Sequence, residues 1–377
     1  MGDSNLSETT SLPPPNVALE MWMIAPMPPE QRRAIPADAV EGQWTAPDGH
    51  AIRRIDWPGR PRADGSLRGS LVFLPGRGDF YEKYLEALDT WHRQGWRVTA
   101  LDWRGQAGSG RFAPDPRVGD VPDFAVWVDD LAAFWAGLPA EPAPRVVVGH
   151  SMGGHLVLRA LEEERLEPDA AVLVAPMLGF ANPLPAWLLH AVARLRCLTG
   201  DPQRRAWKGS EKPGSPLRER ARLLTNDEHR YADELFWRDE RPALDLGTGS
   251  WRWVERALAS MRLVTRRDRL ARVHTPLLIL AAKRDKLVSY AAIRRVSHRL
   301  PRVQLAAWGP TARHELLREE DSVRNQVLER MIHFFDRVVP KKVVAPEPPA
   351  PAPVGTSAPI YGRRRSDRRK PRASAAS

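Results

Sequence analysis

Residues 149–153 read Gly-His-Ser-Met-Gly, a G-x-S-x-G pattern with Ser151 at its centre. The apolar run 146–148 comes directly before it, and a helix is predicted from about Gly154. A strand that turns this sharply into a helix holds its serine in strained backbone and leaves the hydroxyl exposed. We therefore predict a nucleophile elbow with Ser151 as the nucleophile. A chance pentapeptide is the alternative, and the strand–turn–helix context argues against it.

A serine nucleophile needs a base and an acid that orients the base, and candidates for both follow later strands. The apolar run 276–282 predicts a buried parallel strand, and Asp285 comes just after it. The next predicted strand is 303–308, and His314 lies beyond its end. We predict that His314 is the base and Asp285 the orienting acid, because serine hydrolases with such an elbow carry their residues in the order Ser, Asp, His.

Other residues compete for these two roles. Asp285 could instead pair with a neighbouring lysine, and His314 could lie at a helix end without chemistry. Asp102 follows an earlier strand and is a weaker alternative as the acid. His150 should point away from the nucleophile in an elbow, and His274 precedes its strand, at the opposite edge of the sheet.

Two backbone N–H groups are predicted to bind the negatively charged oxygen of an acyl-transfer intermediate. One belongs to Met152, the residue after the nucleophile. The other belongs to Arg77, in the loop after the predicted strand 69–74, where Gly76 and Gly78 let the backbone approach a ligand.

Short apolar strands alternate with helices through most of the chain, which predicts an α/β fold with a mostly parallel, doubly wound sheet. No strand pattern occurs between about 176 and 273, so we predict an inserted helical cap there. The predicted organisation is an irregular N-terminal segment (1–40), the first part of the core (41–175), the cap (176–273), the second part of the core (274–338) and a disordered basic tail rich in proline and alanine (339–377).

Apolar side chains in the predicted cap are candidates for an acyl pocket. They are Leu178, Phe180, Trp187 and Trp253. For each of them, packing of the cap onto the core is the alternative role.

The formal net charge is +11, but most of it is concentrated at one end. From Pro340 onward the chain has nine basic and two acidic residues, which account for +7 of that charge. A tail of this kind is either solvated or contacts anionic lipid, and a nucleic-acid partner is less favoured. The single cysteine, Cys197, and the lack of a signal-like start favour a cytoplasmic protein, with peripheral contact to the inner face of the membrane left open.

Several segments together resemble the bacterial lysophospholipase and monoacylglycerol lipase group of serine hydrolases. They are residues 149–154, 102–110 and 312–317, with 224–227 and 249–253 in the predicted cap. This resemblance implies an α/β-hydrolase fold and hydrolysis of lysophospholipid or monoacylglycerol esters through an acyl-enzyme, without cofactor or metal. A general carboxylesterase, thioesterase or acyltransferase remains an alternative, as does a non-catalytic module that acts through its tail.

The resemblance covers about residues 43–338 and departs from the group at two positions. Pro75 stands where the group has the histidine of a His-Gly pair, and Ala107 replaces a glycine. Neither change removes a predicted backbone donor, although both affect the expected pocket and hence the substrate. The oligomeric state is not predicted.

Overall fold

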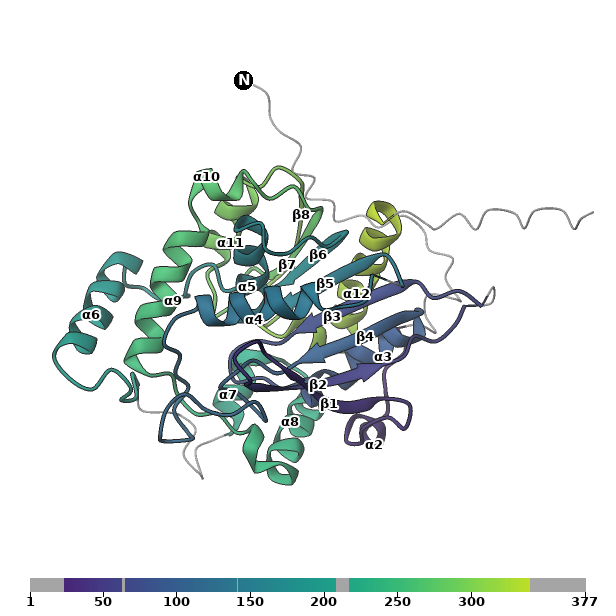
Figure 1. The fold of residues 1–377 in the computed structure, drawn as a ribbon, viewed down its shortest axis with the longest axis horizontal. Coiled ribbons are helices and arrows are strands. Elements are labelled where there is room, and N and C mark those ends of the chain that lie inside the picture. The colour runs from purple at the N-terminus through teal and green to yellow at the C-terminus, as the bar shows by residue number, and fades with distance from the viewer. Residues whose placement is uncertain (1–23, 63–64, 141, 208–216, 340–377) are drawn as a thin grey trace, which may run out of the picture. The chain divides into compact units, whose positions relative to one another are not determined.

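One eight-stranded sheet organises the chain in the computed structural model, which describes residues 24–62, 65–140, 142–207 and 217–339 (Figure 1). The strand order is β1-β2-β4-β3-β5-β6-β7-β8, and only the β1–β2 and β2–β4 pairs are antiparallel. The strands are β1 (Val40–Thr45), β2 (Ala51–Trp57), β3 (Gly69–Leu74), β4 (Trp96–Leu101), β5 (Arg145–His150), β6 (Ala170–Val174), β7 (Leu277–Ala282) and β8 (Val303–Trp308). The predicted mostly parallel α/β sheet is confirmed.

Helices cover both faces of the sheet. They are α4 (Ala125–Ala136), α5 (Met152–Glu162) and α11 (Tyr290–Ser297) on one face, and α3 (Leu85–Arg93) and α12 (Asp321–Val338) on the other. A hydrophobic core lies on each face of the sheet. Successive residues of each central strand pack into opposite cores, as Val147 and Val148 of β5 do. Burial on both faces explains why these strands are continuous apolar runs in the sequence.

The order of the central strands creates the place for an active site. From β3 the chain crosses through α3 to β4, and it then returns through α4 to β5 on the far side of β3. The connections after β3 and β5 therefore diverge at the carboxyl edge of the sheet. Ligands of open α/β sheets bind in the crevice at such a switch point.

Five α-helices are inserted between β6 and β7, where the sequence predicts a helical insertion, and among the described residues of 176–273 there is no extended strand. They are α6 (Ala186–Leu198), α7 (Leu217–Leu224), α8 (Glu228–Glu240), α9 (Trp251–Val264) and α10 (Arg267–Leu270), with the 3-10 turn η2 (Pro242–Leu244) between α8 and α9. Helices α6 and α9 pack against each other at one end of the molecule, whereas α8 lies at the lower edge of the view in Figure 1.

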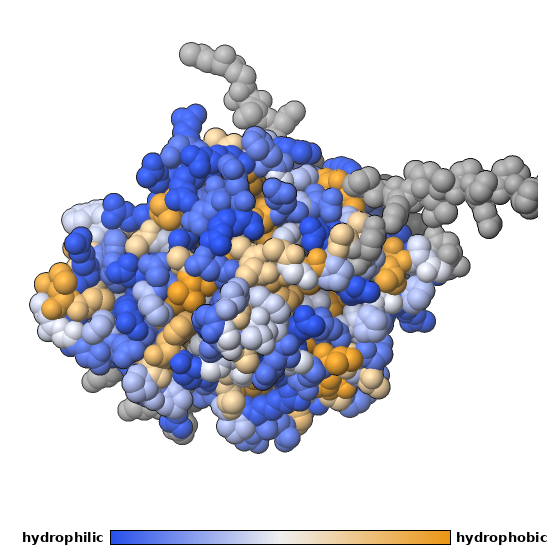
Figure 2. All heavy atoms as spheres, in the orientation of Figure 1, coloured by the Kyte–Doolittle hydropathy of each residue, from blue (hydrophilic) through white to orange (hydrophobic). Residues whose placement is uncertain are grey.

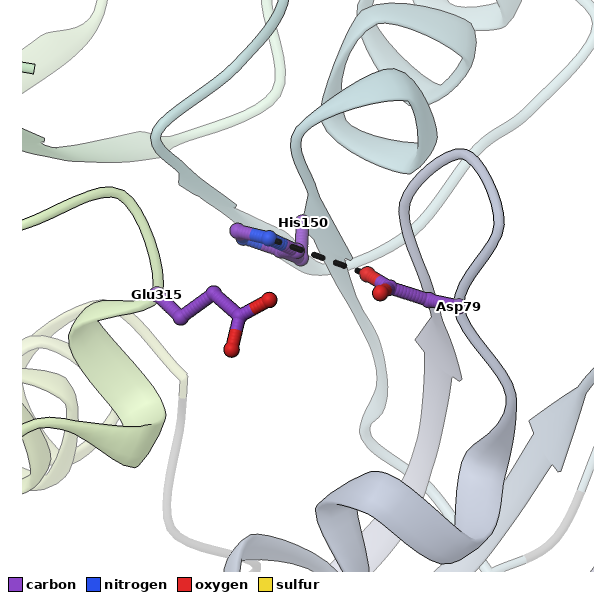
Figure 3. Close-up of side chains that lie close together, drawn as sticks. All are labelled: Asp79, His150 and Glu315. Carbon is purple, nitrogen blue, oxygen red and sulfur yellow. Dashed lines mark ion pairs between the residues drawn. The ribbon is translucent and has the colours of Figure 1, made fainter. Parts of the chain in front are cut away.

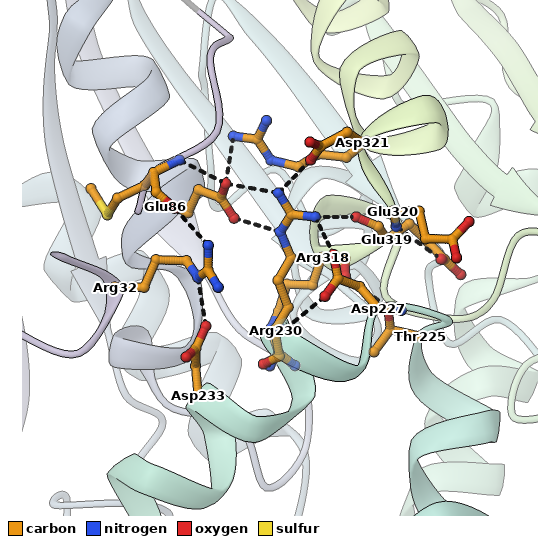
Figure 4. A network of polar contacts seen from close by, with 12 residues as sticks. Arg32, Glu86, Thr225, Asp227, Arg230, Asp233, Arg318, Glu319, Glu320 and Asp321 are labelled. Atoms are coloured by element: carbon orange, nitrogen blue, oxygen red, sulfur yellow. Dashed lines mark hydrogen bonds and ion pairs between the residues drawn. The ribbon is translucent and has the colours of Figure 1, made fainter. Parts of the chain in front are cut away.

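Arg230 on α8 fastens this insertion to the core (Figure 4). Its guanidinium donates to both carboxylate oxygens of Glu86 on α3, at 2.6 and 2.8 Å. It also contacts Asp227 and Asp321, each at 2.6 Å, and the backbone oxygen of Glu319 at 2.8 Å. All five N–H groups of the buried Arg230 guanidinium therefore have acceptors. These contacts hold α8 rigidly against α3 and the start of α12.

The N-terminal region differs in part from its predicted irregular character. A four-residue helix, α2 (Pro29–Arg32), occurs within it, and β1 already begins at Val40. The predicted basic tail and the first 23 residues lie outside the described residues. In the part of the chain that is described, no helix is long and apolar enough to cross a membrane.

Candidate active site

Ser151 lies in the sharp turn between β5 and α5. Its backbone has φ +52° and ψ −114°, a conformation that side-chain-bearing residues rarely adopt. The turn is tight enough that a Cβ added to Gly153 would lie 2.3 Å from the backbone oxygen of Leu74. A Cβ on Gly149 would lie 2.8 Å from the backbone of Gly153. The close approach of the end of β3 thus requires a glycine at 153, and the close approach of the start of α5 requires one at 149.

The structure brings the three predicted residues Ser151, His314 and Asp285 into one chain of hydrogen bonds. His314 Nε2 lies 2.9 Å from Ser151 Oγ, and His314 Nδ1 lies 2.7 Å from Asp285 Oδ2. An ionised carboxylate only accepts, so the Nδ1 proton points to Asp285 and Nε2 accepts from the serine hydroxyl. The arrangement can remove a proton from Ser151 as it attacks a carbonyl carbon.

Backbone contacts fix the orienting carboxylate. Asp285 Oδ1 accepts the N–H groups of Leu287 at 2.7 Å and Val288 at 3.0 Å, which leaves Oδ2 for His314. Burial raises the pKa of Asp285, but the charge and hydrogen bond of His314 outweigh it, so the pKa lies below its ordinary value. Burial in turn lowers the pKa of His314, and Asp285 more than offsets this, so the pKa of His314 is raised.

Asp102, the weaker alternative as the acid, is engaged elsewhere. Its carboxylate accepts from Arg53 Nη1 at 2.9 Å and from the backbone N–H of Tyr81 at 3.1 Å. It is fully buried, and no described contact joins it to His314. Burial raises its pKa to about 8 despite Arg53. Its position supports a role in bracing the loop after β3.

Side chains hold the loop that carries Arg77 on both sides. The N–H of Gly76 donates to Asp79 Oδ2 at 3.1 Å, and the N–H of Gly78 donates to Gln106 Oε1 at 2.6 Å. The side chain of Arg77 reaches the insertion, where Nη2 donates to the backbone oxygen of Gly247 at 2.6 Å. The loop is therefore preorganised by residues of the core and the insertion, as a binding site for a developing oxyanion requires.

Sequence reasoning missed the roles of Asp79 and Gln106. For Asp79 the sequence did contain a local signal, because a carboxylate three residues after Gly76 can accept a hydrogen bond from the backbone of its own loop. Gln106 had no such signal, because it approaches Gly78 only through the pairing of β3 with β4.

Three buried polar side chains lie close together near the candidate triad (Figure 3). Asp79, His150 and Glu315 converge from three segments, with ligand atoms within 4.8 Å of one another, a spacing that could hold a metal ion. However, the Lys83 ammonium lies 2.6 Å from both Asp79 and Glu315 and 3.0 Å from Glu234. This cation compensates the carboxylates, so the group is better described as an ion-pair cluster than as a metal site.

His150 contributes no charge to this cluster. Its ring centroid lies 4.9 Å from that of His314, and Nε2 lies 3.8 Å from Asp79. Burial and the proximity of His314 lower the pKa of His150 to about 4. It is therefore a neutral side chain at neutral pH, and it packs between the catalytic-site candidate His314 and the loop after β3.

A cavity of about 490 Å³ opens beside Ser151 and is lined mainly by the insertion. Of the four predicted pocket residues, Phe180 and Trp253 line it, and Leu178 lines a neighbouring cavity. Trp187 lines neither and is 68% exposed on α6, which corrects the prediction for this residue. Helix α6 packs on α9 through its other face, where Ala193 is buried, and leaves Trp187 pointing to the surface.

Aromatic and aliphatic residues that were not predicted also line this cavity. They are Trp207, Trp251, Leu189, Leu223, Leu224 and Val254. No sequence pattern marks them, because they come from separate helices and from a loop of the insertion.

The switch-point sheet, the serine elbow after β5 and the helical insertion define an α/β hydrolase. The chain belongs to the hydrolase family described as "Serine aminopeptidase, S33", which matches residues 65–321. It is 31% identical to lysophospholipase L2 of Escherichia coli over 283 residues, 71% of this chain and 80% of that protein. It is 25% identical to the probable lysophospholipase L2 of Haemophilus influenzae over 279 residues, 72% of this chain and 85% of that protein.

Solved structures share the fold. A soluble variant of monoglyceride lipase from Saccharomyces cerevisiae, in complex with a substrate analog, has a TM-score of 0.64 at 18% identity, covering 82% of this chain and 97% of that one. A carboxyl esterase from Bacillus coagulans has a TM-score of 0.63 at 16% identity, covering 80% of this chain and 99% of that one.

Proposed function

We propose that this protein is a serine ester hydrolase that acts on single-chain lipid esters, namely lysophospholipids or monoacylglycerols. The observation that carries the proposal is the hydrogen-bonded chain Ser151–His314–Asp285 at the edge of an apolar cavity. The relatives named lysophospholipase L2 support the lipid substrate. This complete series of hydrogen bonds argues against a non-catalytic module, because such a module does not need a serine in strained backbone.

In the proposed mechanism, His314 removes the proton from Ser151 as its oxygen attacks the ester carbonyl. Asp285 keeps the imidazole in the required tautomer and stabilises the imidazolium. The N–H groups of Met152 and Arg77 bind the oxyanion of the tetrahedral intermediate. His314 then protonates the leaving alcohol, and a water activated by His314 releases the fatty acid from the acyl-enzyme.

The family description names an aminopeptidase, and the charges in the cavity favour an ester substrate instead. An aminopeptidase needs an anionic group to hold the α-ammonium of its substrate. The acidic residues that line the described cavity are Asp79 and Glu315, and Lys83 already pairs with both. The rest of the wall is dominated by tryptophan and aliphatic side chains, which suit an acyl chain.

We further propose that residues 176–273 act as a cap over this cavity and that the protein contacts membrane surfaces from the cytoplasm. Exposed apolar residues cluster on and just before α6, where Figure 2 shows apolar atoms at the outer edge of the molecule. They are Leu184, Trp187, Val192, Leu195 and Leu198. A basic tail attracts anionic lipid, and this apolar surface supplies the complementary contact with acyl chains.

A fluorophosphonate probe tests the proposed nucleophile. We expect intact-mass analysis to show one phosphonyl adduct on the wild type and none on Ser151→Ala. An ester panel then compares lysophospholipid, monoacylglycerol, p-nitrophenyl acyl ester, acyl thioester and amino-acid p-nitroanilide. Preference for the thioester or the anilide, or labelling of Ser151→Ala, would contradict the proposal. Acyl transfer to an added alcohol measures the acyltransferase alternative.

A further inference from the structure

A second cavity, of about 570 Å³, lies next to the cavity beside Ser151, among α6, α9 and α11. Phe180, Asn182 and Leu189 line both cavities. These residues belong to the loop after β6 and to α6, so the two cavities share a wall made by that part of the insertion.

The residues of α9 and α11 that line this second cavity recur at intervals of three and four. Each helix therefore presents one face to the cavity. The lining residues are Leu258, Met261, Arg262 and Thr265 on or after α9, and Ala292, Arg295, Val296 and Arg299 on or after α11. On both helices the arginines lie toward the C-terminal end. The cavity is therefore apolar toward the shared wall and cationic at its far end.

No acidic residue lines this cavity among the described residues, although three arginines do. Arg299 donates to the backbone oxygen of Thr265 at 3.0 Å, and Arg262 Nη1 lies 3.2 Å from His190 Nδ1. Arg295 forms no ion pair with a described residue. Three positive charges with no carboxylate beside them favour an anionic group as ligand.

The arginines are too far along the cavity to hold the head group of a substrate bound at Ser151. Phe180 contacts the start of α9, with its ring centroid 6.2 Å from that of Trp253. From Trp253 to Arg262 the helix advances by about 13 Å. Only a glycerol separates the ester from the phosphate of a lysophospholipid, and this spacer is much shorter, so the head group of a substrate bound at Ser151 does not reach these arginines.

We propose that the second cavity binds a long-chain fatty acid anion, with its carboxylate at Arg262, Arg295 and Arg299 and its chain directed along the apolar end toward Phe180. The apolar lining and the three arginines together favour an amphiphilic anion as ligand. The choice of a fatty acid rests on the proposed esterase function, because each turnover releases one. An occupant of the second cavity would contact the wall that the two cavities share.

Calorimetric titration of the full-length protein with dodecanoate, below its micelle concentration, tests this proposal. We expect Arg262→Gln/Arg295→Gln/Arg299→Gln to bind dodecanoate at least about tenfold more weakly, because charge-assisted hydrogen bonds are lost. Arg294→Gln is the matched control, since Arg294 is exposed like the three lining arginines and lies on the same helix as Arg295, but does not line the cavity. Circular dichroism checks that each variant is folded, and the single variants replace the triple one if it is not.

Two further comparisons locate the ligand. Protein whose Ser151 carries a small methylphosphonate, scored by intact mass, should still bind dodecanoate, and dodecanol should bind more weakly than dodecanoate. Equal binding by the triple variant and wild type, equal binding of dodecanol, or loss of binding on phosphonylation would overturn the proposal. If dodecyl phosphate bound more tightly than dodecanoate, the cavity would favour a phosphate head group, and the choice of a fatty acid as ligand would be overturned. Failure of Ser151 to react would contradict the proposed function alone, because the arginine comparison does not depend on it.

Discussion

Lys83 and Glu315 form a buried ion pair of 2.6 Å that joins two parts of the candidate active site. Glu315 directly follows His314 in the chain, and Lys83 also binds Asp79, which holds the loop of Arg77. The side chain of Lys83 is fully buried. Burial lowers its pKa, but Asp79, Glu234 and Glu315 outweigh this and raise the pKa above its ordinary value. One ammonium thus links the segment that carries the candidate base to the loop that carries Arg77.

Replacement of Lys83 by Met should destabilise the protein by about 3–5 kcal/mol, because it leaves buried carboxylates without their counter-charge. Activity on a soluble ester should fall as well, since the loop and His314 lose their common support. Urea unfolding and ester kinetics measure both effects. Lys283→Met is the control, because Lys283 is exposed. Adding Glu315→Gln to Lys83→Met should recover part of the stability, and a fully additive loss would contradict the coupling.

Asp285→Asn should lower kcat by about 10⁴-fold, because the amide no longer fixes the imidazole tautomer that accepts the serine proton. Asp102→Asn should leave kcat on the same ester much closer to wild type, since Asp102 binds Arg53 rather than His314. Stopped-flow and steady-state kinetics with a p-nitrophenyl ester compare the two. A large loss in Asp102→Asn with a small loss in Asp285→Asn would reverse the assignment.

The pH dependence of kcat/KM should report the raised pKa of His314. Only the neutral imidazole accepts the serine proton, so activity is lost as the pH falls through this pKa. The half-maximum should lie above 6.5, the ordinary histidine value, because Asp285 stabilises the imidazolium. Asp285→Asn should move the half-maximum of its residual activity to lower pH. An unchanged half-maximum would show that the carboxylate does not set the pKa.

The raised pKa of His314 also makes the stability of the protein depend on pH. A pKa that is higher in the folded than in the unfolded protein adds to the free energy of unfolding below about pH 6.5, and this contribution disappears as the pH rises through the folded value. Asp285 has a lowered pKa, so its contribution is present above its ordinary value of 3.8 and is lost as the pH falls through its folded value.

Gly153→Ala should disrupt the elbow, because the new Cβ would lie 2.3 Å from the backbone oxygen of Leu74 and 2.6 Å from that of Pro75. Backbone atoms cannot rotate away as a side chain can, so β3 or α5 must move, at a cost of about 1–3 kcal/mol and most of the activity. Gly137→Ala is a matched control, since its nearest neighbour would lie at 3.6 Å. Thermal unfolding and ester kinetics of both variants provide the comparison, and equal behaviour would contradict the steric argument.

The sheet and the Ser–His–Asp residues could be predicted because their signals are local. Buried parallel strands are apolar runs, and the three candidate catalytic residues follow the ends of those runs. Trp187 could not be placed in the same way, because the side of α6 that is buried depends on its packing against α9, a helix far from it in the sequence. The supporting cluster around Lys83 was also missed, since Lys83, Glu234 and Glu315 meet only after the insertion has packed on the sheet.

Truncation after Val339 should separate hydrolysis from membrane binding. Val339 is the last residue of the chain that the structure describes, and the catalytic candidates all precede it. Kinetics on a monomeric soluble ester should therefore remain unchanged. Each basic residue near an anionic surface contributes about 1 kcal/mol, so the full-length protein should bind anionic vesicles more tightly at low salt than the truncated form.

Vesicle co-sedimentation with and without added salt measures this difference. Salt should weaken the contribution of the tail, whereas contact through the exposed apolar residues of α6 should persist in the truncated protein, because apolar burial is not screened. A full-length variant with glutamine at the six basic positions of 363–370 serves as the control for the loss of chain length. If the full-length and truncated proteins bind equally at low salt, the tail has no role in membrane contact, and any binding that remains must come from the folded part of the chain.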